Sequence, residues 1–133
     1  VVEYSRLMAA DEPGTLAAID MIRNGEIGEP RMFNSLFCFP MAPGNHRLKA
    51  EHWGGALQDI GVYCVNAVRY LFGEEPVEAI AMDGTMAGDP RFAEVPEMVA
   101  ATLRFPKGKL AQFICSFGGD EICFIPNPEA GSW

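Results

Sequence analysis

The feature that most constrains the fold is a two-faced segment bounded by glycines, "GGALQDIGVYCVNAVRYLFGEEP", residues 54–76. Helical geometry turns by about 100° per residue. Four polar side chains then fall within a sector of roughly 60°: Asp59, Tyr63, Asn66 and Tyr70. Apolar side chains cluster nearly opposite: Leu57, Ile60, Cys64, Val68 and Leu71. The segment therefore predicts one helix whose apolar face packs on a sheet and whose polar face looks outward.

The polar face carries a carboxylate and a phenol one turn apart, Asp59 and Tyr63. A carboxylate accepts hydrogen bonds from hydroxyl groups, and a phenol both donates and accepts, so the pair suits alcohol chemistry. The pKa of a free tyrosine is about 10, so the phenol needs a nearby cation to act as a base near neutral pH. Arg47 or a lysine from elsewhere would supply it. The alternatives are a solvated face or a pair kept for packing and hydrogen bonding.

Helical spacing also marks residues 13–30, "PGTLAAIDMIRNGEIGEP", through Leu16, Ile19 and Ile22. We expect Thr15 to cap the start of this helix and Gly25 to end it. Period-two alternation predicts a strand over residues 31–39, and residues 40–53 form a loop that leads into the striped helix. Residues 1–8 form a short β-favouring run.

Short β-like runs follow the striped helix at 76–86, 95–105, 108–117 and 121–126, with turn residues between them. This pattern predicts an antiparallel meander. The fold class is therefore α+β, with helices packed on one face of a mostly antiparallel open β-sheet in a single domain of residues 1–133. Val99 and Leu103 alternate with Ala100 and Thr102, so the second face is weakly polar and suits a subunit contact.

Net charge and cysteine usage argue against several classes of partner and site. The 18 acidic residues against 10 basic residues give a formal charge of -8, which disfavours nucleic acid and anionic membranes as partners. There is no apolar run of about 18 residues and no signal-peptide pattern at the first residues, so we expect a cytoplasmic protein, with periplasmic export left open. Four cysteines without a C-x-x-C pair are expected as buried thiols, and no metal site is expected: Cys38, Cys64, Cys115 and Cys123.

Three stretches resemble the C-terminal domain of the glucose-fructose oxidoreductase, or Gfo/Idh/MocA, family: "GEIGEPRMFNS", "HRLKAEHWGGALQDIGVYCVNAVRYLFGEEPVE" and "DPRFAEV". The resemblance runs from about Tyr4 to at least Phe117. Its most specific part is the pattern G-G-x-x-x-D-x-G-x-Y/H, met by Gly54, Gly55, Asp59, Gly61 and Tyr63. The resemblance implies an N-terminal Rossmann domain that binds NADP or NAD, followed by an α+β domain that covers the nicotinamide and mediates oligomerisation.

The resemblance also implies roles for individual residues. Tyr63 would give or take the proton on the reacting oxygen, and Asp59 would orient the sugar hydroxyl and the phenol. Arg47 would contact substrate or cofactor, and His46, where relatives often carry Trp, is a further substrate-binding candidate. Asn66 is a substrate-binding candidate too, although for Asn66 and Tyr70 support or packing is favoured.

This sequence resembles only the second part of the family's proteins. It contains no G-x-G-x-x-G fingerprint after a strand, and it lacks the lysine of the family's E-K-P motif. We therefore expect a fragment or an expressed domain that does not catalyse alone, and whose sheet ends in an exposed edge that favours a homo-oligomer.

The leading function is the substrate-binding and oligomerisation domain of an NAD(P)-dependent sugar or polyol oxidoreductase. The alternative is a non-catalytic sugar-binding or assembly module with the same fold. A third reading is chemistry like that of dihydrodiol dehydrogenase or biliverdin reductase on the same scaffold. The identity of the sugar, and the choice between NADP and NAD, stay open.

Overall fold

The structure, a computed structural model, describes residues 13–119. The predicted β runs at residues 1–8 and 121–126, and Cys123, lie outside the described residues. Between residues 13 and 119, no helix is both long and apolar enough to cross a bilayer.

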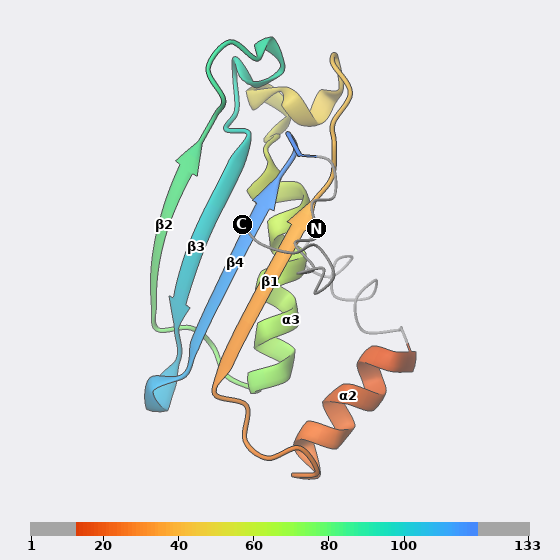
Figure 1. Cartoon of the computed structure of the whole chain (residues 1–133), viewed down its shortest axis with the longest axis vertical. Coiled ribbons are helices and arrows are strands. Elements are labelled where there is room, and N and C mark those ends of the chain that lie inside the picture. Colours follow the sequence, from red (N-terminus) through yellow and green to blue (C-terminus); the bar gives the residue numbers. More distant parts are fainter. Residues whose placement is uncertain (1–12, 120–133) are drawn as a thin grey trace, which may run out of the picture.

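The centre of the fold is a four-stranded sheet in the order β1-β4-β3-β2 (Figure 1). The strands are β1 (Met32–Cys38), β2 (Glu78–Gly84), β3 (Met98–Arg104) and β4 (Leu110–Ser116). Strands β2, β3 and β4 form the predicted antiparallel meander, whereas β1 pairs with β4 in parallel. The mostly antiparallel α+β fold is confirmed. The parallel pair arises because the chain crosses the sheet through a helix between β1 and β2, so β1 joins the far side of the meander.

The predicted helix forms behind the sheet, but it is not uniform. A wider π-helical turn, η3 (Leu57–Gly61), precedes the regular helix α3 (Val62–Phe72), which ends at Gly73 in the left-handed conformation with φ 63°. The π turn shifts the helical phase, so Leu57 is exposed and does not join the buried face, contrary to the prediction. The other apolar positions of the stripe are buried or partly buried: Ile60, Cys64, Val68 and Leu71.

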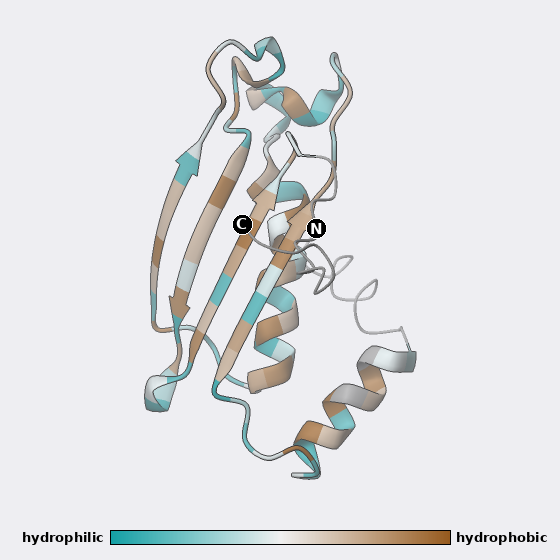
Figure 2. Ribbon diagram, viewed as in Figure 1, coloured by the Kyte–Doolittle hydropathy of each residue, from teal (hydrophilic) through white to brown (hydrophobic). Residues whose placement is uncertain are grey.

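The core lies between α3 and the face of the sheet that α3 covers. Val68 has no exposed surface, and it shares one cluster with Phe113 and Cys115 of β4 and Leu103 of β3. At the lower end of α3, the rings of Phe72 and Phe105 meet edge to face at 5.0 Å. Apolar residues recur along β3, β4 and α3 (Figure 2). The burial of these side chains, at about 25 cal/mol per Å² of apolar surface, fixes α3 to the sheet.

Helix α2 (Pro13–Arg23) lies beside the sheet, and its contacts are with α3 (Figure 1). The described helix begins at Pro13, so Thr15 lies within its first turn and the predicted cap at Thr15 is wrong. Pro13 and Gly14 are already helical, so Thr15 cannot be the non-helical residue that an N-cap requires. Ile19 is buried, whereas Leu16 is exposed, so only part of the predicted apolar face finds a partner. Gly25 follows the helix with φ 75°, as the prediction requires.

The second face of the sheet is open. Leu36, Ile114, Ala100 and Met82 stand in one row across β1, β4, β3 and β2. All four residues are exposed, and Met82 retains 79% of its accessible surface. A groove of about 370 Å³ runs over this face and is lined by Ile80, Met82, Ala100, Thr102 and Ile114 among others. The weakly polar second face predicted from the alternation of β3 is confirmed.

Candidate active site

The site begins in the loop between β1 and η3, which we call the Arg47 loop and define as residues 39–55. Its first turn, η1 (His46–Leu48), is capped by Asn45, whose Oδ1 accepts a hydrogen bond from the Arg47 N–H at 2.9 Å. A second turn, η2 (Ala50–His52), follows. Trp53 then adopts a left-handed conformation with φ 53°, which turns the chain back toward η1.

Two glycines join this loop to the helix. A Cβ at Gly54 would collide with the carbonyl of Arg47 and would stand 2.8 Å from the Lys49 oxygen. The Gly55 N–H donates to the same Arg47 carbonyl at 2.9 Å, and Gly55 has φ 126°, which disfavours any side chain. The G-G pair is therefore required for the Arg47 loop to lie directly against the start of η3.

This close approach brings together two residues that are distant in sequence. The Arg47 Nε donates to Asp59 Oδ1 at 3.0 Å, and the two side chains keep 42% and 33% of their accessible surface. A half-exposed pair of this kind contributes at most about 1 kcal/mol to stability, so its main effect is to orient the two groups. Among the described residues, only Nε of this guanidinium has a side-chain partner, so its other N–H groups are available as donors.

Tyr63 lies one turn beyond Asp59 and is half-buried. Its ring meets Phe37 of β1 edge to face, with centroids 5.9 Å apart and an interplanar angle of 66°. Gly61 makes this arrangement possible, because a Cβ at Gly61 would stand 3.0 Å from Cys115 Sγ and 2.9 Å from Leu57. The D-x-G-x-Y pattern thus combines two partly exposed polar groups with a glycine that lets the helix approach β4.

The remaining candidates lie apart from this pair. His46 is exposed, and its ring centroid is 6.3 Å from that of His52. Asn66 is only 6% exposed, so the predicted outward-facing stripe is wrong at this position; its Oδ1 accepts from Arg69 Nη1 at 3.2 Å. Asn66 and Tyr70 line a polar pocket of about 330 Å³ near the C-terminal end of α3. The structure therefore brings Arg47 and Asp59 together beside Tyr63, and the substrate roles of His46 and Asn66 stay predictions.

The cysteines behave as apolar side chains. Cys64 and Cys115 are buried, Cys38 is half-buried, and none of these three described cysteines is in a disulfide. Burial raises the pKa of the Cys115 thiol to about 12. Burial also raises the pKa of Cys64, against a hydrogen bond from Ser35. Both therefore stay protonated near neutral pH and are poor nucleophiles. Over residues 13–119, no group of three or more His, Cys, Asp or Glu residues gathers in an arrangement that could hold a metal ion.

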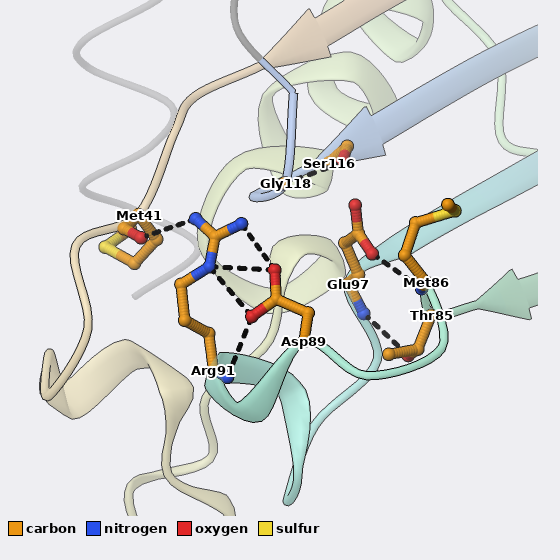
Figure 3. Close-up of polar contacts among 8 residues, drawn as sticks. All are labelled: Met41, Thr85, Met86, Asp89, Arg91, Glu97, Ser116 and Gly118. Carbon is orange, nitrogen blue, oxygen red and sulfur yellow. Dashed lines mark hydrogen bonds and ion pairs between the residues drawn. The ribbon is translucent and has the colours of Figure 1, made fainter.

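One set of residues around the Arg47 loop was not predicted from the sequence. It lies in the loop between β2 and β3, where Asp89 pairs with Arg91 and Glu94 pairs with Lys49 (Figure 3 draws the first of these pairs). The D-P-R stretch carries a local signal, since Asp followed by Pro is typical of a capped turn. Its contact with the Arg47 loop has no local signal, because the partners are far apart along the chain.

Comparison with known proteins identifies the family of this domain. The GFO/IDH/MocA C-terminal domain matches residues 15–121. D-xylose 1-dehydrogenase [NADP(+)] of Haloarcula marismortui is 39% identical over 103 residues, which cover 71% of this chain and 28% of that protein. Trans-1,2-dihydrobenzene-1,2-diol dehydrogenase of Mus musculus is 29% identical over 118 residues, which cover 86% of this chain and 32% of that protein.

A solved structure is similar as well. The aldose-aldose oxidoreductase from Caulobacter crescentus, crystallised with glycerol, superposes with a TM-score of 0.80 at 35% identity, covering 84% of this chain and 34% of that one. The chain thus spans about a third of the length of the relatives it matches. Its fold, its G-G-x-x-x-D-x-G-x-Y pattern and these likenesses agree: the chain belongs to the GFO/IDH/MocA family of oxidoreductases and forms its C-terminal domain.

Proposed function

We propose that this chain is the substrate-binding and oligomerisation domain of an NAD(P)-dependent oxidoreductase that acts on a sugar or polyol. One observation carries the proposal: Tyr63, half-buried against Phe37 of β1, lies one helical turn from an Asp59 carboxylate that Arg47 orients. Relatives named as dehydrogenases and reductases of sugars support the substrate class.

The cofactor fits this chain only in part. Arg47 offers N–H donors toward an anionic or polar ligand, but no glycine-rich loop between a strand and a helix cradles phosphates within residues 13–119. A nicotinamide cofactor would therefore be held mainly by a Rossmann domain outside this chain. When bound, it supplies or accepts the hydride.

The chain's own residues would then manage the substrate oxygen. In the direction of carbonyl reduction, the Tyr63 O–H gives its proton to that oxygen as the carbon gains a hydride. In the reverse direction, the Tyr63 oxygen takes the hydroxyl proton as hydride leaves the same carbon. Asp59 accepts a hydrogen bond from a neighbouring sugar hydroxyl, and Arg47 keeps the Asp59 carboxylate in one orientation.

The direct test is Tyr63→Phe in the full-length protein, with hydride transfer measured across a panel of sugars and polyols. We expect kcat to fall by about a hundredfold or more, because the ring packing against Phe37 remains while the proton carrier is lost. Tyr70→Phe, on the same helix but beyond the pair, is the matched control and should retain turnover. Undiminished turnover in Tyr63→Phe would contradict the proposal.

A non-catalytic sugar-binding or assembly module remains the second candidate, and the open face of the sheet favours the assembly part of it. The apolar row of Leu36, Ile114, Ala100 and Met82 suits a second copy of the same chain. Titration calorimetry separates the two candidates. Sugar binding without nucleotide favours the module, and binding that requires the nucleotide-binding domain favours the enzyme.

The assembly surface has its own test. Met82→Lys places a charge in the apolar row and should convert an oligomer into monomers in sedimentation velocity. Met86→Lys is the control, since Met86 is similarly exposed but lies in the β2–β3 loop. An oligomer that persists unchanged in Met82→Lys would rule this face out as the contact.

A further inference from the structure

The loop between β2 and β3, residues 85–97, is fixed at its base by a buried carboxylate. Glu97 is only 5% exposed; its Oε2 accepts from the Met86 N–H at 2.8 Å, and its own N–H donates to Thr85 Oγ1 at 3.2 Å (Figure 3). A Cβ at Gly118 would collide with this carboxylate, so the glycine leaves room for it. The two ends of the loop are thus tied to each other, and the Phe117 N–H donates to the Glu97 carbonyl at 3.0 Å, which ties them to the chain after β4.

The middle of the loop is held by a second set of contacts. Asp89 caps the short turn η4 (Pro90–Phe92), accepting from the Arg91 N–H at 3.0 Å. The same carboxylate binds the Arg91 guanidinium in a two-pronged pair, with Nη2 to Oδ2 at 2.6 Å and Nε to Oδ1 at 3.0 Å. Phe92 and Val95 are buried in the main core. The loop therefore presents its side chains from a fixed backbone.

Two of these side chains reach the Arg47 loop on either side of Arg47. Before it, Arg91 Nη1 donates to the Met41 carbonyl at 3.0 Å (Figure 3). After it, Glu94 accepts from Lys49 Nζ at 2.5 Å and from the Ala50 N–H at 3.2 Å. Met41 and Leu48 of the Arg47 loop are buried in the same core as Phe92 and Val95.

From this arrangement we infer that the β2–β3 loop positions Arg47: Arg91 and Glu94 hold the Arg47 loop at two points, so that the guanidinium faces Asp59. The inference rests on the proposed function for its catalytic consequence, but the positioning itself is a property of the fold. Arg91 and Glu94 are positioning residues, because they act through the backbone of the loop and not on the substrate. Their loss should weaken substrate binding more than the chemical step.

The test uses Glu94→Gln in the full-length protein and has two readouts. The first is hydrogen exchange of the Gly55 amide, which bonds the Arg47 carbonyl and does not touch Glu94. Loss of one exposed ion pair should speed this exchange by about two- to fivefold while the melting temperature stays near that of the parent. The second readout is sugar KM, which should rise by a similar factor with kcat retained.

Glu78→Gln is the matched control. Glu78 also forms an exposed pair, with Arg104 at 3.1 Å between β2 and β3, but this pair touches neither loop. Both readouts should be unchanged in this variant. A combined Lys49→Glu and Glu94→Lys variant should restore much of the slow Gly55 exchange, because it rebuilds the pair with reversed charges.

The outcomes are distinguishable. Unchanged Gly55 exchange in Glu94→Gln would overturn the inference, whatever the enzyme does. Faster exchange with unchanged KM would overturn the catalytic consequence. Faster Gly55 exchange in Glu94→Gln, together with a parent protein that turns over no sugar, would uphold the positioning and count against the proposed function.

Discussion

The two ends of the helical segment each carry a carboxylate paired with a cation, and the two pairs differ in their surroundings. At the N-terminal end, Asp59 and Arg47 are half-exposed beside Tyr63. At the C-terminal end, Lys109 keeps 9% of its side-chain surface, lies 3.2 Å from Glu74 and 3.5 Å from Glu29, and stands over the Phe72 ring.

The difference separates a structural pair from a pair open to a ligand. The Lys109 ammonium ties the β3–β4 hairpin to the end of α3, and its removal leaves a largely enclosed Glu74, one of whose oxygens is buried without a hydrogen bond. The Asp59 carboxylate can exchange its contacts with water or a hydroxyl group at little cost. Two pairs of opposite charges therefore have different effects according to their burial.

The largest expected effect is on stability at the enclosed end. Lys109→Met should lower the free energy of unfolding by about 2–4 kcal/mol, because Glu74 loses its compensating charge in a confined place. Arg47→Met at the open end should cost less than about 1 kcal/mol. Urea denaturation of the two variants measures the contrast. Equal losses of unfolding free energy in the two variants would contradict the proposed difference between the enclosed and the open pair.

A steric change tests how the open pair is assembled. Gly54→Ala should cost about 1–3 kcal/mol, since the new Cβ meets the Arg47 carbonyl backbone, which has no flexible end to move. The Arg47 loop should move away from η3 and separate Arg47 from Asp59. Thermal unfolding and a crystal structure of the variant would show both effects. Gly14→Ala, with open space around it in α2, should be neutral or slightly stabilising.

The smallest expected effect is that of acid pH on the contacts that hold the Arg47 loop. A hydrogen bond from Lys49 lowers the pKa of the Glu94 carboxyl, with a further contribution from the Ala50 N–H. The charged groups that face Glu94 are Lys49 and His52. A hydrogen bond from the Arg91 side chain lowers the pKa of Asp89 in the same way.

Depressed carboxyl pKa values set the direction of the pH effect. Their stabilisation is complete above the ordinary carboxyl pKa of about 4 and is lost as the pH falls through the lowered values. Exchange of the amides of residues 46–55, corrected for intrinsic rates, should therefore accelerate below about pH 4. The same acceleration in a Glu94→Gln variant would show that other groups are responsible.

Local pattern accounts for much of the fold and part of the site. The period of two in β1 and β3, the apolar spacing that leads from Ile60 to Val68, and the left-handed glycines are local properties of the backbone, and they could be predicted. The π turn was missed, because the spacing of apolar residues was interpreted with the regular α-helical period throughout.

Sequence alone determined that a helix carries Asp59 and Tyr63 on one side, because that placement depends only on helical spacing. It also showed that glycines surround the pair. Tertiary structure decided that β1 pairs in parallel with β4, that Arg47 meets Asp59, and that Glu94 reaches Lys49 across the two loops. These contacts join segments that are far apart in the chain, and only the packing of the common core brings such segments together.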